Sequence, residues 1–293
     1  MVVTDTKGPQ NDHAVQVESG VDWAECWRAN RMHATLTEST LHYWSDRAQR
    51  FKATSHPTGY ARTFLERTEF RDGETVIDMG CGAGTLALPL AMQGHRVIAC
   101  DYSQQMLDRL VQFAEMAGVA SNIEPYCVSW SDSWDELPVA DVFLASRSLC
   151  TRDLGATLQA MEAHTRRRCC MTVPTYLSPR HDTTMLNAIG RTEILPSEDV
   201  YVVNLLMQMG RLPEVSYIKR VYPPVGEDLH DVREAFERED GPFTPEESKL
   251  LDEFIANNYK VATDSLGVSI VHRSYVREVC WAYIAWDVPS KDV

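Results

Sequence analysis

The sequence predicts an α/β fold: a doubly wound, mostly parallel sheet of seven strands, with an N-terminal helical lid and a late helical insertion. Three observations support this prediction. Short apolar runs rich in β-branched residues alternate with segments whose apolar residues recur at helical spacing, which is typical of βαβ units. A glycine-rich turn follows the first predicted strand, and the second predicted strand ends on an acid.

The stretch Thr75–Asp101 holds the most informative pattern. Its elements, in chain order, are a strand, a glycine-rich turn, a helix, a second strand and an acid: 75–79, 80–84, 85–92, 96–100 and Asp101. Glycines let the backbone turn sharply and lie against a ligand, and the following helix offers free N–H groups. An acid at the end of the second strand can accept both hydroxyls of a ribose. The pattern therefore indicates a nucleoside-containing ligand.

The spacing of the glycines separates families of nucleotide-binding loops. A dinucleotide fingerprint needs a third glycine at position 85, where Thr85 stands, and a P-loop needs a lysine that is absent. The order Asp78-x-Gly80-x-Gly82-x-Gly84 instead resembles the first motif of class I S-adenosylmethionine (SAM) methyltransferases, and the segment 101–107 resembles the next motif of that family. The resemblance covers residues 43–176. It implies a SAM-dependent transferase, with S-adenosylhomocysteine (SAH) as product.

The resemblance also implies which residues contact the cofactor. The loop residues would bring backbone to the methionine part, Asp101 would bind the ribose, and Ser129 with Trp130 would flank the adenine. Packing within the loop is an equal alternative for Trp130. The implied set, in chain order, is Asp78, Gly80, Cys81, Gly82, Gly84, Asp101, Tyr102, Ser129, Trp130, Ala145 and Ser146.

The N-terminal part is predicted to be a loose tail over 1–20 and a helical lid over 21–57. The segment Y-W-S-D-R-A at 43–48 is similar to one that covers the SAM site in the family, which implies three further cofactor neighbours: Tyr43, Trp44 and Arg47. The alternative is that the aromatic residues of 21–57 only pack this segment onto the sheet. Trp23, Trp27 and His33 are weaker candidates for the substrate side.

Residues 58–293 are predicted to form the SAM-binding domain, with a helical insertion at about 224–266. The remaining helices and strands are expected as follows: helices at 58–70, 104–117, 155–164 and 198–209, and strands at 122–128, 140–145, 167–173, 215–222 and 276–286. The run Glu227–Glu253 holds 11 acidic and three basic residues, a net charge of −8. We interpret it as the solvated face of two inserted helices.

Methyl transfer from a sulfonium is an in-line displacement at carbon, so the protein mainly has to position the acceptor. A general base is needed only if the acceptor must lose a proton. Histidines are candidates because they titrate near neutral pH: His33, His56 and His181. Tyr176 follows a strand end and is a candidate pocket residue. Arg147 either binds an anionic group of the substrate or pairs with a surface acid.

Composition narrows the acceptor. The 293 residues are 44% hydrophobic and carry a net charge of −14, which disfavours nucleic acid as the main partner. The tetrad [DNS]-P-P-[YFW] of amino-directed nucleic-acid methyltransferases is replaced by S-R-S-L at 146–149. The leading hypothesis is a small-molecule methyltransferase. The alternatives are a methyltransferase acting on tRNA or protein, hinted at by Arg147 and Arg166–Arg168, and a non-catalytic SAM-binding regulator.

The eight cysteines form no C-x-x-C pair. Several stand in apolar runs, where cysteine behaves as a small hydrophobe. Without a secretory signal or a membrane-spanning run, the sequence predicts a reducing, cytoplasmic compartment, with no metal site and no membrane association. Cys81 is not expected to be a nucleophile, since methyl transfer needs none. A homodimer is left open.

Overall fold

The computed structural model describes residues 20–30, 48, 58–179, 181–192, 197–222, 228–263 and 269–289. The predicted tail over 1–20 lies outside the described residues except for Gly20. So do five predicted site residues, namely His33, Tyr43, Trp44, Arg47 and His56.

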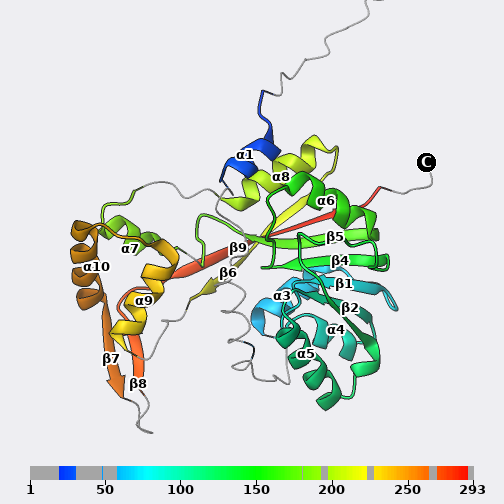
Figure 1. Ribbon diagram of the computed structural model, residues 1–293, viewed down its shortest axis with the longest axis horizontal. Coiled ribbons are helices and arrows are strands. Elements are labelled where there is room, and N and C mark those ends of the chain that lie inside the picture. Colours follow the sequence, from blue (N-terminus) through cyan, green and yellow to red (C-terminus); the bar gives the residue numbers. More distant parts are fainter. Residues whose placement is uncertain are drawn as a thin grey trace, which may run out of the picture.

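A seven-stranded sheet forms the centre of the molecule, in the order β3-β2-β1-β4-β5-β9-β6 (Figure 1). Strands β1 to β5 run parallel, and β9 is antiparallel to both of its neighbours, β5 and β6. This arrangement confirms the predicted fold class. The strands are β1 Thr75–Met79, β2 Arg96–Asp101, β3 Ile123–Cys127, β4 Ala140–Ser146, β5 Thr165–Pro174, β6 Glu214–Val221 and β9 Glu278–Asp287.

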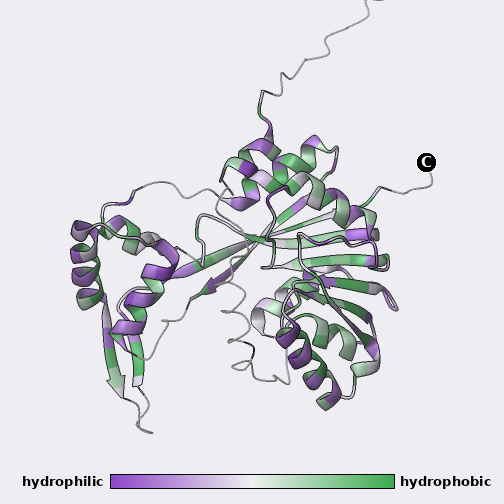
Figure 2. Cartoon of the chain, viewed as in Figure 1, coloured by the Kyte–Doolittle hydropathy of each residue, from purple (hydrophilic) through white to green (hydrophobic). Residues whose placement is uncertain are grey.

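Helices cover both faces of the sheet, so its central strands are apolar on both sides (Figure 2). Alternate residues of one strand serve opposite faces: Val76 packs with one group of helices and Ile77 with the other. One group is α3 Gly59–Thr68, α4 Ala87–Met92 and α5 Gln104–Met116. The other is α1 Trp23–Asn30, α6 Leu154–Ala163 and α8 Glu198–Gln208.

Helix α1 is anchored by its two tryptophans. The rings of Trp23 and Trp27 both meet Tyr201 of α8 edge to face, with centroids 6.1 and 6.0 Å away. Trp27 is 1% exposed, and its Nε1–H donates to the carbonyl of Thr151 at 3.1 Å. The contacts of these two tryptophans are therefore those of packing, the alternative that the sequence left open.

Most predicted elements are present with ends shifted by a few residues. Ser103 is the N-cap of α5, and its side chain accepts a hydrogen bond from the Met106 N–H at 3.4 Å. Helix α4 begins at Ala87 rather than at Thr85, because the chain makes turns over 82–86 before the helix starts. A short 3-10 helix, η1 Ala120–Asn122, precedes β3.

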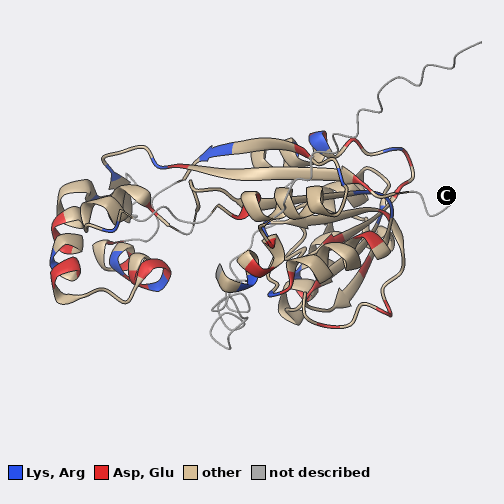
Figure 3. Ribbon diagram, turned by 90° about the horizontal axis from the view of Figure 1, so that it is seen from above, with Lys and Arg blue, Asp and Glu red and all other residues tan. Residues whose placement is uncertain are grey.

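A second, smaller group of elements lies beyond the carboxyl end of β5 and is called the accessory unit here (Figure 1). It consists of α7 Thr183–Ala188, α9 Leu229–Asp240, α10 Pro245–Asn258, β7 Tyr259–Thr263 and β8 Ser269–Arg273. Its own apolar core includes Phe236, Leu251 and Phe254. Charged residues line the outer turns of its helices (Figure 3), in keeping with the solvated face expected for the acidic run.

The sequence predicted two of the helices of the accessory unit, α9 and α10, but neither α7 nor the antiparallel hairpin of β7 and β8. The hairpin has little apolar signal to detect. Of its ten residues only Tyr259 and Val271 are buried, while Val261 and Ile270 are 43% and 40% exposed. The hairpin therefore lacks the alternation of buried and exposed residues by which a strand is recognised in a sequence.

Candidate active site

The glycine-rich loop crosses the end of β2. The N–H groups of Gly80 and Cys81 both donate to the carbonyl of Cys100, at 2.7 and 2.9 Å. Gly80 has φ +75°, and a Cβ there would lie 2.3 Å from the Cβ of Ser148. Gly82 has φ +53°, but a Cβ there would meet nothing within 4 Å. Packing thus requires a glycine at position 80, whereas the backbone at position 82 faces open space that a ligand can enter.

Asp101 joins the loop to the start of α5. Its Oδ2 accepts from the Gly82 N–H at 2.8 Å, and its Oδ1 accepts from the Ser103 N–H at 2.9 Å. The side chain is buried, and burial raises the pKa of this carboxyl against the opposing effect of these two hydrogen bonds. An ionised carboxylate has about four acceptor positions. Asp101 can therefore accept two further hydroxyls while still holding the loop.

Asp78, at the end of β1, is a buried carboxyl with an unused oxygen. It is 2% exposed, and among the described residues its Oδ2 has no hydrogen-bond partner. Burial, and then the nearby charge of Asp101, raise the pKa of Asp78 to about 7, while the Ala87 N–H opposes the shift. A buried acceptor without a donor is costly. An ammonium group brought to Oδ2 would supply both the donor and the opposite charge.

Cys81 is 5% exposed, and its thiol is close enough to both acids to be affected by their charges. Burial, followed by the charges of Asp78 and Asp101, raises the pKa of its thiol well above the usual value. The thiolate is the nucleophilic form of cysteine, and here it is strongly disfavoured. The environment therefore agrees with the expectation that Cys81 contributes backbone rather than chemistry.

The loop after β3 carries the residues predicted to flank an adenine. Ser129 donates its N–H to Oδ2 of Asp132 at 2.7 Å, and its carbonyl accepts from Nε1 of Trp134 at 3.0 Å. Trp130 is 9% exposed and packs edge to face on Trp134, with ring centroids 5.7 Å apart. Trp130 Nε1 has no hydrogen-bond partner in the described part of the chain. The ring is thus held in place by packing, and its contact with an adenine stays a prediction.

A polar cluster marks the carboxyl end of β4. Ala145 is fully buried, and Ser146 Oγ lies 2.8 Å from the hydroxyl of Tyr60 on α3. That hydroxyl also lies 2.6 Å from Thr172 Oγ1 on β5, which accepts from the N–H of Arg147 at 3.1 Å. The guanidinium of Arg147 sits over the Tyr60 ring, 4.1 Å from its centroid.

Sequence reasoning missed Tyr60 and Thr172. It predicted a helix over 58–70 and a strand over 167–173 but gave neither residue a role in the site. One signal was available, since a buried tyrosine hydroxyl normally finds a hydrogen-bond partner. The identity of that partner depends on residues 112 positions apart in the chain, so the pattern along one helix cannot reveal it.

The remaining candidates lie away from the glycine-rich loop. Tyr176 follows β5 and is 58% exposed. His181 lies in the connection to α7, with Nδ1 2.7 Å from Oδ1 of Asp240. It lines a cavity of about 210 Å³ at the accessory unit, together with Asp182 and Arg277. His181 is thus part of a separate polar group.

The described residues contain no group of three or more His, Cys, Asp or Glu side chains arranged to hold a metal ion. None of the helices in the same ranges combines the length and the apolar character that a membrane span requires.

Known proteins resemble either a central part of this chain or most of it. A family model described as a methyltransferase domain matches residues 76–168, the part that holds the glycine-rich loop and Asp101. An uncharacterized protein of Haemophilus influenzae is 33% identical over 239 residues, which cover 79% of this chain and 83% of that protein. The tRNA 5-carboxymethoxyuridine methyltransferase of Escherichia coli K12 is 49% identical over 49 residues, which are 17% of this chain and 19% of the enzyme.

A solved structure shares the architecture. A Bacillus halodurans protein assigned as a methyltransferase superposes with a TM-score of 0.52 at 11% sequence identity, covering 78% of this chain and 99% of that one. At this identity the likeness concerns the fold alone. Together with the sheet order, the Asp78–Gly84 loop and the matched family domain, it leads to one conclusion. The chain belongs to the class I SAM-dependent methyltransferase family.

Proposed function

We propose that the protein transfers a methyl group from SAM to a small-molecule acceptor. The observation that carries the cofactor assignment is the buried Oδ2 of Asp78, which has no partner among the described residues and lies at the base of the glycine-rich loop. The α-ammonium of SAM suits this oxygen. Asp101 has acceptor positions left for the ribose hydroxyls. Gly82 leaves open space beside its backbone for the methionine part.

In this proposal the chain binds and orients rather than reacts. SAM, when bound, supplies a methyl group that its sulfonium has already activated for displacement. Asp78 would hold the ammonium end and Asp101 the ribose, so the cofactor would be fixed at both ends of one loop. Ala145 and Ser146, at the end of β4, would lie beside the methionine part. Such positioning can supply up to about 7–11 kcal/mol of the barrier reduction in ideal cases.

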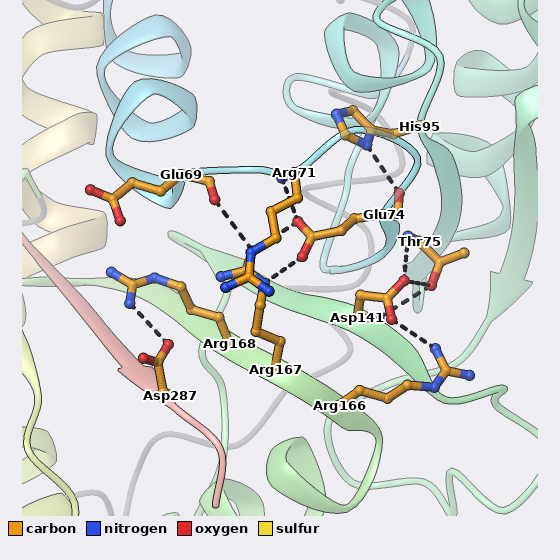
Figure 4. A network of polar contacts seen from close by, with 10 residues as sticks. All are labelled: Glu69, Arg71, Glu74, Thr75, His95, Asp141, Arg166, Arg167, Arg168 and Asp287. Carbon is orange, nitrogen blue, oxygen red and sulfur yellow. Dashed lines mark hydrogen bonds and ion pairs between the residues drawn. The ribbon is translucent and has the colours of Figure 1, made fainter. Parts of the chain in front are cut away.

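The small-molecule acceptor is supported by the state of the basic triplet Arg166–Arg168, the main hint of a nucleic-acid partner. All three side chains are bound to acids (Figure 4). Arg167 holds Glu74 with two nitrogens, and Arg168 is 4% exposed between Glu214 and Asp287. The triplet also stands near the start of β5, whereas the candidate site lies at the carboxyl ends of the parallel strands. Phosphate binding needs unpaired cations, and the net charge of −14 opposes it further.

A methyl-transfer assay tests this proposal. Purified protein and SAM labelled in its methyl group are incubated together in three separate reactions. One contains a small-metabolite extract, one total tRNA and one total protein. We expect label in the small-molecule fraction alone. Label in tRNA or in protein would contradict the acceptor class. Binding of SAM without transfer to any of the three fractions would favour a regulatory SAM-binding protein.

Replacing Asp101 by alanine is expected to weaken SAH binding about 10- to 100-fold, because two hydrogen bonds to a charged acceptor are lost. The carboxylate also holds the N–H groups of Gly82 and Ser103, so the loop itself loses a support. Calorimetric titration measures the affinity. Asp72→Ala, at an acid on an exposed turn away from the loop, serves as the control. An unchanged affinity in Asp101→Ala would exclude the ribose role.

A further inference from the structure

Arg147 is held in an unusual backbone conformation. It is one of two non-glycine residues with positive φ in the described part of the chain, at +57°. The left-handed region is unfavourable for a residue that carries a Cβ. The hydrogen bond from its N–H to Thr172 Oγ1, at 3.1 Å, helps to hold this conformation. Strain of this kind persists where the surrounding contacts impose it, and it is common at functional sites.

The contacts of the guanidinium leave its hydrogen-bonding edge free. Arg147 stacks on the Tyr60 ring, 4.1 Å from the centroid, and the side chain has no carboxylate partner among the described residues. By contrast, Arg166, Arg167 and Arg168 each bind at least one acid in a chain with 42 of them. Stacking on Tyr60 uses the face of the guanidinium. Its N–H donors point outward in the plane of the guanidinium and remain able to bind an anion there.

The platform under Arg147 is rigid. The Tyr60 hydroxyl lies 2.8 Å from Ser146 Oγ and 2.6 Å from Thr172 Oγ1, and Tyr60 is 4% exposed. These contacts fix the ring from two strands at once. A side chain stacked on a fixed ring loses less conformational entropy when it binds a ligand, which favours specific recognition.

The position of Arg147 connects it to the cofactor loop. The next residue along the chain, Ser148, packs against that loop: its hydroxyl donates to the carbonyl of Met79 at 2.5 Å, beside Gly80. The preceding residue, Ser146, is predicted to lie beside the methionine part of SAM. Arg147 therefore stands at the carboxyl end of β4, where open α/β sheets place their ligands.

We propose that Arg147, stacked on Tyr60, binds an anionic group of the methyl acceptor, either a carboxylate or a phosphate. This inference rests on the proposed function, because it names the acceptor class for the same site. The guanidinium is planar and presents paired N–H donors that match both kinds of anion. Of the two readings that the sequence left open for this residue, the absence of a carboxylate partner in the described chain favours substrate binding over a surface ion pair.

Nuclear magnetic resonance can observe the anion contact directly. The full-length protein, saturated with SAH, is titrated with benzoate, with phenyl phosphate and with the neutral analogue benzamide. The Nε–Hε signal of Arg147 is identified by its loss in Arg147→Gln. We expect a saturable shift of this signal with one or both anions and none with benzamide; the stronger of the two distinguishes carboxylate from phosphate. The absence of a saturable shift with either anion, or an equal shift with benzamide, would overturn the inference.

Arg166→Gln is the matched control, because it removes an exposed arginine bound to Asp141 at the far end of the same strands. It should leave the Arg147 signal and its response unchanged. Once an acceptor is known, Arg147→Gln should raise its KM about 10- to 100-fold with a smaller change in kcat. Arg147→Lys should restore part of the loss.

Calorimetry with SAH separates this inference from the proposed function. We expect Arg147→Gln to bind SAH within about twofold of the wild type, since the mutation removes no cofactor contact in this account. A loss greater than tenfold would assign the guanidinium to the carboxylate of the cofactor itself and would overturn the acceptor assignment. Failure of the wild type to bind SAH would instead refute the proposed function, and the anion titration of the unliganded protein would still test Arg147.

Discussion

Replacing Asp78 by asparagine is expected to stabilise the unliganded protein at pH 8 and to remove most of its affinity for SAM. Burial raises the pKa of Asp78 from 3.8 to about 7, so the folded state binds this proton more tightly than the unfolded state does. Stability contributed by this proton is present below pH 3.8 and is lost as pH rises toward 7. Above pH 7 the ionised carboxylate costs about 4 kcal/mol, which asparagine avoids.

The measurement is the free energy of unfolding against pH, for the wild type and for Asp78→Asn. The wild type should lose stability relative to the variant as pH rises from 3.8 to about 7, the window between the two pKa values. Asp72→Asn, on an exposed turn, controls for the loss of one negative charge. Parallel stability curves for the wild type and Asp78→Asn would show that Asp78 is not a buried, strained acid.

The same variant tests the role of Asp78 in binding. The wild-type affinity for SAH should fall as pH drops below about 7, because a protonated carboxyl no longer attracts the ammonium group. Asp78→Asn should bind weakly and without this pH dependence. If the variant is more stable and yet binds SAH as the wild type does, the buried carboxylate lowers stability without contributing to binding. Asp78 would then not be a cofactor-binding residue.

Replacing Gly80 by alanine is expected to destabilise the protein by about 2–5 kcal/mol, the sum of a left-handed backbone and an overpacked contact. The new Cβ would lie 2.3 Å from the Cβ of Ser148, at φ +75°. Ser148 cannot turn aside easily, because its hydroxyl is bonded to the carbonyl of Met79 at 2.5 Å. The loop would have to move, so cofactor binding should fall as well.

Gly73→Ala is the matched control for this prediction. Gly73 has nearly the same φ, +76°, but a Cβ there would meet nothing within 4 Å. Its cost should be about 1–2 kcal/mol, that of the backbone conformation alone. Ser148→Gly should recover part of the stability lost in Gly80→Ala, since it removes the opposing Cβ. Denaturant unfolding measures all three variants, and equal costs for Gly73→Ala and Gly80→Ala would refute the packing argument.

The sequence predicted the parts of this protein that depend on local pattern. The strand, glycine turn, helix and acid of Thr75–Asp101 follow one another in the chain, so their order and spacing alone indicated the sheet and the loop. The predicted fold is confirmed by the strand order and the antiparallel β9. The buried Asp78 also follows from its place at the end of an apolar strand.

The sequence could not reveal contacts between residues far apart in the chain. The hydroxyl of Tyr60 meets Ser146 and Thr172 across 86 and 112 positions. The triplet Arg166–Arg168 resembled a basic patch, and only the fold brings Glu74 and Asp141 to it. The run of three arginines in the sequence therefore suggested more basic surface than the fold presents. Arg147 stands out from the triplet only in the structure, where its guanidinium stacks on Tyr60 and has no carboxylate partner among the described residues.

We propose above that the glycine-rich loop after β1, together with Asp78 and Asp101, binds SAM. Calorimetric titration of the purified full-length protein with SAM, with SAH and with NADH is the direct test of this binding. We expect binding of SAM and SAH and none of NADH, because the glycine spacing lacks the dinucleotide pattern. Binding of NADH alone, or of none of the three, would exclude a SAM site in this protein.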